Sequence, residues 1–162
     1  MNQQLTAHGV GLIILVGPSG AGKSSWLAAN AQPEEIVSTD GIREELTGDF
    51  RDQSMNNQVF SLFHQRIHDR LQAGHRVYAD ATHLRTRDRL TTAQIGFDLN
   101  VPVTYLVINR PLEEKLITAG WREQVVINGK SLVELHDETF RSNEKAILTG
   151  DGKNVLVIDT RI

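Results

Sequence analysis

Residues 17–24 read Gly-Pro-Ser-Gly-Ala-Gly-Lys-Ser and match the pattern G-x-x-x-x-G-K-[ST] at every fixed position. Glycines let the backbone curl until successive N–H groups point at one anion, and a helix that starts there adds its favourable dipole. Lys23 is expected to reach the β- and γ-phosphates of a nucleoside triphosphate, and the Ser24 hydroxyl to bind Mg²⁺. The residues predicted to contact ATP, or another nucleoside triphosphate, are Gly17, Pro18, Ser19, Gly20, Ala21, Gly22, Lys23, Ser24 and Ser25.

Around this loop the chain alternates between strand and helix patterns. Residues 12–16, Leu-Ile-Ile-Leu-Val, form a continuous apolar run, as a strand buried on both faces does. Further strands are predicted over residues 36–38, 76–79, 103–108 and 154–158, and helices over 23–31, 53–73, 86–95 and 131–148. This order predicts an α/β P-loop NTPase fold, with a five-stranded, mostly parallel sheet and helices on both faces. A helical lid is expected at about residues 112–130.

The length and composition indicate one globular domain over residues 1–162, with 40% hydrophobic and 23% charged residues. There are no cysteines, which excludes disulfides and thiolate metal sites. No apolar run is long enough to span a bilayer, so we expect no membrane partner and a cytoplasmic location, which is the host's if a phage encodes the chain. The net charge of −3 gives no global basic field for nucleic acid. The oligomeric state stays open.

The remaining motifs favour a small kinase among nucleotide-binding proteins. The N-K-x-D pattern that reads guanine is absent, and 162 residues are too few for a motor ATPase. In a parallel sheet, ligands bind beyond the carboxyl ends of the strands. The residues that follow each strand are therefore the candidates for chemistry.

Acidic residues follow two of the predicted strands. Asp40 comes just after the second strand, where its carboxylate can accept the proton of an attacking hydroxyl, and Arg43 can neutralise transferring or substrate charge. The alternative for Asp40 is the N-cap of a short helix over residues 42–46. Asp80 ends the third strand, where a carboxylate holds Mg²⁺ or binds a substrate hydroxyl.

Arginines beyond the third and fourth strands are candidates for phosphate contacts. If residues 85–89 are helical, Arg85 and Arg89 share one face and Arg87 points elsewhere, although such a cluster is often only solvated. Arg122, in the predicted lid, is placed to close over the phosphates. His83 is either a polar turn residue or a general base.

Together these elements resemble the kinase domain of the 5′-hydroxyl polynucleotide kinases of phage and bacterial RNA repair, from Leu12 to about Ile158. The family's D-x-x-R element is matched by Asp40 and Arg43. The resemblance implies that Asp40 is the general base for the 5′-hydroxyl and that Arg43 contacts the adjacent phosphate.

A second family element, D-x-T-N, reads Asp80-Ala-Thr82-His83 here, with histidine in place of asparagine. The resemblance implies acceptor contacts from Asp80, Thr82, His83 and Arg89, and it implies a γ-phosphate contact from Arg122. Thr118 stands where the companion lid arginine is expected.

The expected function is therefore transfer of the γ-phosphate of ATP to the 5′-OH end of RNA or DNA, with Lys23, Asp40, Arg43 and Arg122 as catalytic residues. A P-loop small-molecule kinase, similar to antibiotic phosphotransferases or zeta-toxin-like enzymes, and a kinase of hydroxymethylated bases in DNA are alternatives. A nucleotide-dependent switch without transfer chemistry is the alternative of another class.

Overall fold

The computed structural model describes residues 11–118 and 126–161, and it contains a five-stranded parallel sheet with the strand order β2-β3-β1-β4-β7. All four pairings within this sheet are parallel. The strands are β1 (Leu12–Val16), β2 (Ile36–Ser38), β3 (Val77–Asp80), β4 (Val103–Val107) and β7 (Leu156–Asp159). The predicted fold class is confirmed, and each predicted strand is present within two residues of its predicted start.

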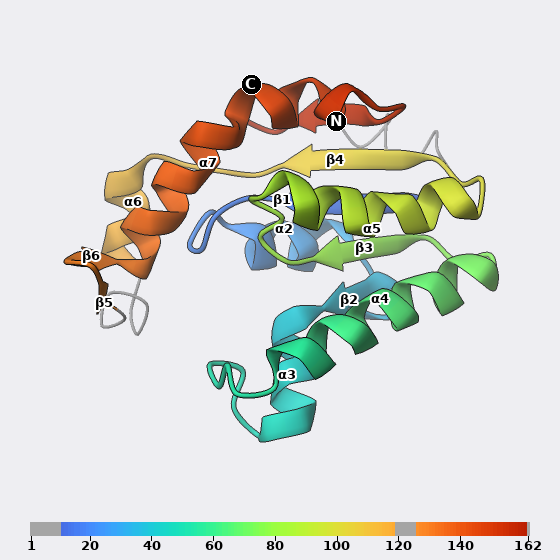
Figure 1. Ribbon diagram of the computed structural model, residues 1–162, viewed down its shortest axis with the longest axis horizontal. Helices are drawn as coiled ribbons and strands as arrows, with labels where there is room; N and C mark the ends of the chain where they lie inside the picture. The colour runs from blue at the N-terminus through green and yellow to red at the C-terminus, as the bar shows by residue number, and fades with distance from the viewer. Residues whose placement is uncertain (1–10, 119–125, 162) are drawn as a thin grey trace.

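Six α-helices connect or follow these strands in the described residues. They are α2 (Lys23–Asn30), α3 (Thr39–Thr47), α4 (Asn56–Gln72), α5 (Thr86–Asp98), α6 (Leu112–Ile117) and α7 (Leu132–Leu148). Short 3₁₀ turns cover Pro33–Glu35 and Gly150–Gly152. In Figure 1 the strand arrows point to the left, so the carboxyl ends of the strands lie on that side, together with α6.

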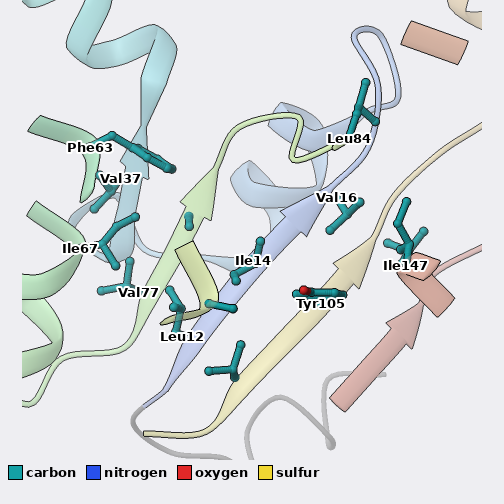
Figure 2. Packing of buried hydrophobic residues seen from close by; sticks show 14 of the residues in the cluster. Leu12, Ile14, Val16, Val37, Phe63, Ile67, Val77, Leu84, Tyr105 and Ile147 are labelled. Atoms are coloured by element: carbon teal, nitrogen blue, oxygen red, sulfur yellow. The ribbon is translucent and has the colours of Figure 1, made fainter. Parts of the chain in front are cut away.

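The sheet is buried on both faces because β1 is apolar at every position. Leu12, Ile14 and Val16 point into a core that includes residues of α4, α5 and α7. Ile13 and Leu15 point to the other face, into a smaller core with α2. Figure 2 shows the larger core, in which side chains of the central strands meet those of α4 and α7. The alternation of side chains along a strand thus explains why both faces need a helical cover.

The region of the predicted lid begins with α6, which Pro111 precedes as the N-cap residue. A small antiparallel hairpin of β5 (Val126–Ile127) and β6 (Lys130–Ser131) then leads into α7. The hairpin was not predicted. The Ser131 hydroxyl caps α7 by accepting a hydrogen bond from the Glu134 N–H. Arg122 lies outside the described residues, so its role stays a prediction. Among the helices of the described residues, none is long and apolar enough to cross a membrane.

Candidate active site

The loop between β1 and α2 has the curled backbone that a phosphate cradle requires. Gly20 and Gly22 have φ angles of 80° and 102°, a region that residues with side chains rarely adopt. At Gly17, an added Cβ would lie 2.1 Å from the carbonyl oxygen of Ile108, so only glycine fits there. The Lys23 Nζ donates hydrogen bonds to the carbonyl oxygens of Gly17 (2.8 Å) and Pro18 (3.0 Å). The lysine is thereby held across the loop it is expected to serve.

Two residues from later in the chain, one of α7 and one that follows β4, also hold this loop. His136 of α7 contacts Ser19: its Nδ1 lies 2.7 Å from the hydroxyl oxygen and 3.3 Å from the backbone nitrogen of Ser19. The Arg110 Nε donates to the carbonyl oxygen of Gly20 at 2.7 Å. Sequence reasoning missed both residues, because nothing in a single sequence relates His136 to a serine 117 positions earlier.

One cleft of about 930 Å³ brings most of the predicted site residues together. This volume is near the upper end of the range of ligand pockets, about 300–1,000 Å³, so the cleft has room for more than a phosphate group. The predicted residues that line it are Ser19, Gly20, Ala21, Gly22, Lys23, Ser24, Ser25, Asp40, Arg43, Asp80, Thr82 and His83. Gly17, Pro18 and Arg89 are not among its lining residues.

Asp40 lies in the first turn of α3 and faces this cleft. The N-cap of α3 is Ser38, whose hydroxyl accepts a hydrogen bond from the Gly41 N–H, so the alternative that Asp40 caps the helix is wrong. The Asp40 side chain is 55% exposed, and its Oδ1 forms an ion pair with Arg43 Nη1 at 2.8 Å. The carboxylate is therefore accessible to a hydroxyl and is fixed in orientation from one side.

Arg43 is almost completely buried, although it lines the cleft. Its guanidinium donates to Asp40, to Asn56 Oδ1 at 3.1–3.3 Å and to the carbonyl oxygen of Phe50 at 3.4 Å. These partners hold the planar guanidinium group in one orientation. In this arrangement Arg43 positions Asp40, and a direct contact with a substrate phosphate, as implied by the family resemblance, stays a prediction.

Asp80 sits beside Asp40 because β2 and β3 pair in register, with Ser38 opposite Asp80. Burial raises the pKa of Asp80, the Lys23 ammonium opposes this rise, and the charge of Asp40 adds to it. A hydrogen bond from Ser38 also stabilises the charged form. Two carboxylates and one lysine thus share the floor of the cleft.

This donor set suits Mg²⁺. The ion prefers oxygen ligands and is usually bound by one or two carboxylates together with substrate phosphates, rather than by a complete protein cage. Ser24 and Asp80 provide a hydroxyl and a carboxylate on the same cleft, and a dication there would offset the burial that raises the pKa of Asp80. In the part of the chain that the structure describes, no group of three or more His, Cys, Asp or Glu residues is placed to hold a metal ion. A Mg²⁺ ion bound together with substrate phosphates does not need such a group.

His83 forms the back of the cleft, and its ring does not offer a free nitrogen to a substrate. Its Nδ1 donates to the carbonyl oxygen of Leu15 at 2.8 Å, so its Nε2 accepts from the Thr92 hydroxyl at 3.0 Å. The residue is 3% exposed and has a φ angle of 49°. Burial lowers the pKa of His83 to about 4. The prediction that His83 binds the acceptor is corrected accordingly: its ring braces the loop after β3 against β1 and α5.

The prediction that Arg89 contacts the acceptor is also corrected. Its side chain is 0% exposed and forms a two-pronged ion pair with Asp151, at 2.8 and 3.0 Å. It also donates to the carbonyl oxygens of His83 and Leu84. Because α5 begins at Thr86, Arg85 is only the N-cap residue, and the predicted face shared by Arg85 and Arg89 is wrong. Arg85 lines the cleft, whereas Arg89 is a buried anchor of the loop that follows Asp80.

The comparison with known families agrees with this geometry. The sequence model of an AAA domain matches residues 12–119, two thirds of the chain, from β1 to just beyond α6. The chain belongs to this family. None of the curated proteins compared with the chain matches it.

The family is one of P-loop NTPase-like kinases and includes polynucleotide-kinase-like enzymes. Membership therefore supports a P-loop nucleotide-dependent, kinase-like activity of the phosphotransferase type. Domains of this kind generally bind a nucleotide with Mg²⁺, in keeping with the loop and the oxygen ligands described above. The acceptor is not fixed by the family.

Proposed function

We propose that this protein transfers the γ-phosphate of ATP to the 5′-hydroxyl end of RNA or DNA. The observation that carries the proposal is the position of the Asp40 carboxylate. It is exposed in the same cleft as Lys23 and Ser24, and Arg43 holds it. A carboxylate in this position can serve as general base for an alcohol that approaches the nucleotide's terminal phosphate.

The proposed reaction needs few groups. Asp40 accepts the proton of the acceptor hydroxyl as the hydroxyl oxygen bonds to the γ-phosphorus, and the bond between that phosphorus and the β–γ bridging oxygen breaks to release ADP. Lys23 and the backbone N–H groups of the loop stabilise charge on the phosphate oxygens. Ser24 and Asp80 would hold Mg²⁺, which would supply further neutralisation of that charge. Arg122 is proposed to add to it from the lid, and Thr82 to contact the acceptor.

The test is transfer of labelled phosphate from ATP to 5′-OH oligonucleotides by the wild type and by the Asp40→Asn variant. Asn keeps the size of the side chain but cannot accept the proton, and loss of a positioned general base costs about 10²–10⁴-fold in rate. ATP affinity, measured by calorimetry, should change little because the phosphate loop is intact. Asp69→Asn is the matched control, since Asp69 is an exposed carboxylate of α4 that contacts Gln65 and His68 and does not line the cleft.

The same assay separates the alternatives. Label on nucleosides or other small alcohols but on no oligonucleotide would indicate a small-molecule kinase. Label at internal hydroxymethylated bases would indicate a modified-base kinase. If ATP binds and no acceptor is labelled, the proposed chemistry is wrong and a nucleotide-dependent switch becomes the better hypothesis. If Asp40→Asn transfers phosphate as fast as the wild type, Asp40 is not the general base and the proposed mechanism is wrong. A cytoplasmic location also stays a prediction.

A further inference from the structure

The cleft continues beyond Asp40 along one face of α4. Asn56, Asn57, Phe60 and His64 all line it, and their spacing of three and four residues places them on one side of the helix. Asn56 is tied to this end of the site through its hydrogen bonds with Arg43. Phe60 is 38% exposed, which is unusual for a phenylalanine, and it lies against Phe63 and His64. An aromatic ring is therefore presented to the cleft.

The beginning of α5 faces the same space with two cations. Arg85 and Arg87 are exposed and line the cleft. Over residues 11–118 and 126–161, no ion pair joins either of them to a carboxylate. Arg43 and Arg89, by contrast, are buried and paired. Arg85 and Arg87 thus keep their planar donor groups available for an anion.

One wall of the cleft is formed by α4 and the start of α5. Two other basic residues at this wall do not supply a cation for an anion. Burial lowers the pKa of His64, and the nearby Asp88 only opposes this shift, so a neutral imidazole is expected at pH 7. Arg51 also lines the cleft, but both oxygens of Asp49 bind its guanidinium. Anion binding on the wall therefore depends on Arg85 and Arg87.

We propose that Phe60, Arg85 and Arg87 form the subsite for the acceptor strand: the ring of Phe60 stacks on a base near the 5′ end, and the two arginines bind the backbone phosphate that follows. This inference rests on the proposed function and adds where and how the strand is held. Stacking on an aromatic ring and contact of arginine with phosphate are the two terms that bind single strands without sequence preference. They also reconcile a net charge of −3 with a nucleic-acid substrate, because the positive charge is local to one wall.

The number of phosphates that the protein neutralises can be measured from the salt dependence of binding. For single strands, log K falls with log[salt] at a slope of about −0.7 per phosphate neutralised, so the one phosphate held by the two arginines contributes about −0.7. The double variant Arg85→Gln/Arg87→Gln should lose this part of the slope and bind a 3′-fluorescein-labelled, 5′-OH single-stranded decamer at least tenfold more weakly by anisotropy. Its ATP affinity should equal that of the wild type.

The matched control is Lys145→Gln/Lys153→Gln, which also removes two positive charges, but from exposed positions that do not line the cleft. The control should keep the wild-type slope. For Phe60, the probe is a decamer with an abasic site at its first position. The wild type and Phe60→Trp should bind the normal decamer several-fold more tightly than the abasic one, and Phe60→Ala should bind both alike.

The outcomes distinguish the two proposals. If the wild type labels the decamer and the Arg85/Arg87 double variant shows the same Kd and slope as the lysine control, the subsite is wrong and the kinase proposal stands. If the wild type binds the decamer with the expected dependence on Phe60 and the two arginines but transfers no phosphate, the subsite stands and the reaction is wrong. If the wild type neither binds nor labels the decamer, both are wrong.

Discussion

Replacing Arg89 with methionine tests whether this arginine is a substrate contact, as its place in the sequence suggests, or a buried anchor. Met has a similar length but no charge and no donor. The change would leave the Asp151 carboxylate, whose side chain is 2% exposed, with the Tyr105 hydroxyl at 2.7 Å and without its two contacts to Arg89. The carbonyl oxygens of His83 and Leu84 would also lose their hydrogen bonds to Arg89.

Breaking a buried ion pair by removing one partner costs about 3–5 kcal/mol in the free energy of unfolding. For a domain of 150–250 residues, each kcal/mol shifts Tm by about 2–4 °C, so Arg89→Met should lower Tm by about 6–20 °C. Thermal unfolding followed by circular dichroism at pH 7 measures this shift. The double variant Arg89→Met/Asp151→Asn should recover part of the loss, because it no longer buries an unpaired charge.

The sign of the pH dependence gives an independent check. Burial favours the neutral form of Asp151, but hydrogen bonds from Arg89 and Tyr105 outweigh it and lower the pKa of this carboxyl below its usual value. A lowered pKa stabilises the fold above the unfolded-state pKa of about 4, and the contribution is lost as the pH falls through the native pKa. The stability gap between wild type and Arg89→Met should therefore narrow below pH 4. A variant that keeps its wild-type Tm while losing oligonucleotide binding would refute the anchor role and restore the substrate contact.

Other residues give smaller or sharper effects. His83 has a pKa of about 4 in the fold and about 6.5 in the unfolded chain, so its protonation at low pH favours the unfolded state. This loss of stability is absent above pH 6.5 and reaches about 2–3 kcal/mol near pH 4.5. His83→Gln should remove it, which urea unfolding at the two pH values measures. Tyr105→Phe should cost about 1–3 kcal/mol through its lost bond to a charged carboxylate, with ATP affinity unchanged by calorimetry. Gly17→Ala should weaken ATP binding at least tenfold, because its methyl group would meet the Ile108 carbonyl at 2.1 Å; Gly41→Ala, whose methyl group meets only Ser38 at 3.6 Å, is the control, and equal affinities in the two would contradict the reasoning.

The sheet and the phosphate loop could be predicted because their causes are local. Five consecutive apolar residues at 12–16 specify a strand buried on both faces, and the glycines that follow specify the turn. The order of strands and helices then limits the topology, and the rule that sites lie at the carboxyl edge led to Asp40 and Asp80. The helix cap at Asp40 was assigned incorrectly as an alternative because Ser38, two residues earlier, competes for the same role and wins.

The sequence could not show which arginines line the cleft and which are buried, because the deciding partner lies far away in the chain. Arg85, Arg87 and Arg89 are the same residue type within five positions, yet Arg89 is buried and the other two are exposed. The difference is the partner: Asp151 lies 62 residues later, in a turn with a φ angle of 53° that brings its carboxylate to Arg89. An arginine enters a core only where such a carboxylate offsets its lost hydration. Arg85 and Arg87 remain hydrated at the cleft, and the same physical cost that excludes them from the core leaves them available for a phosphate.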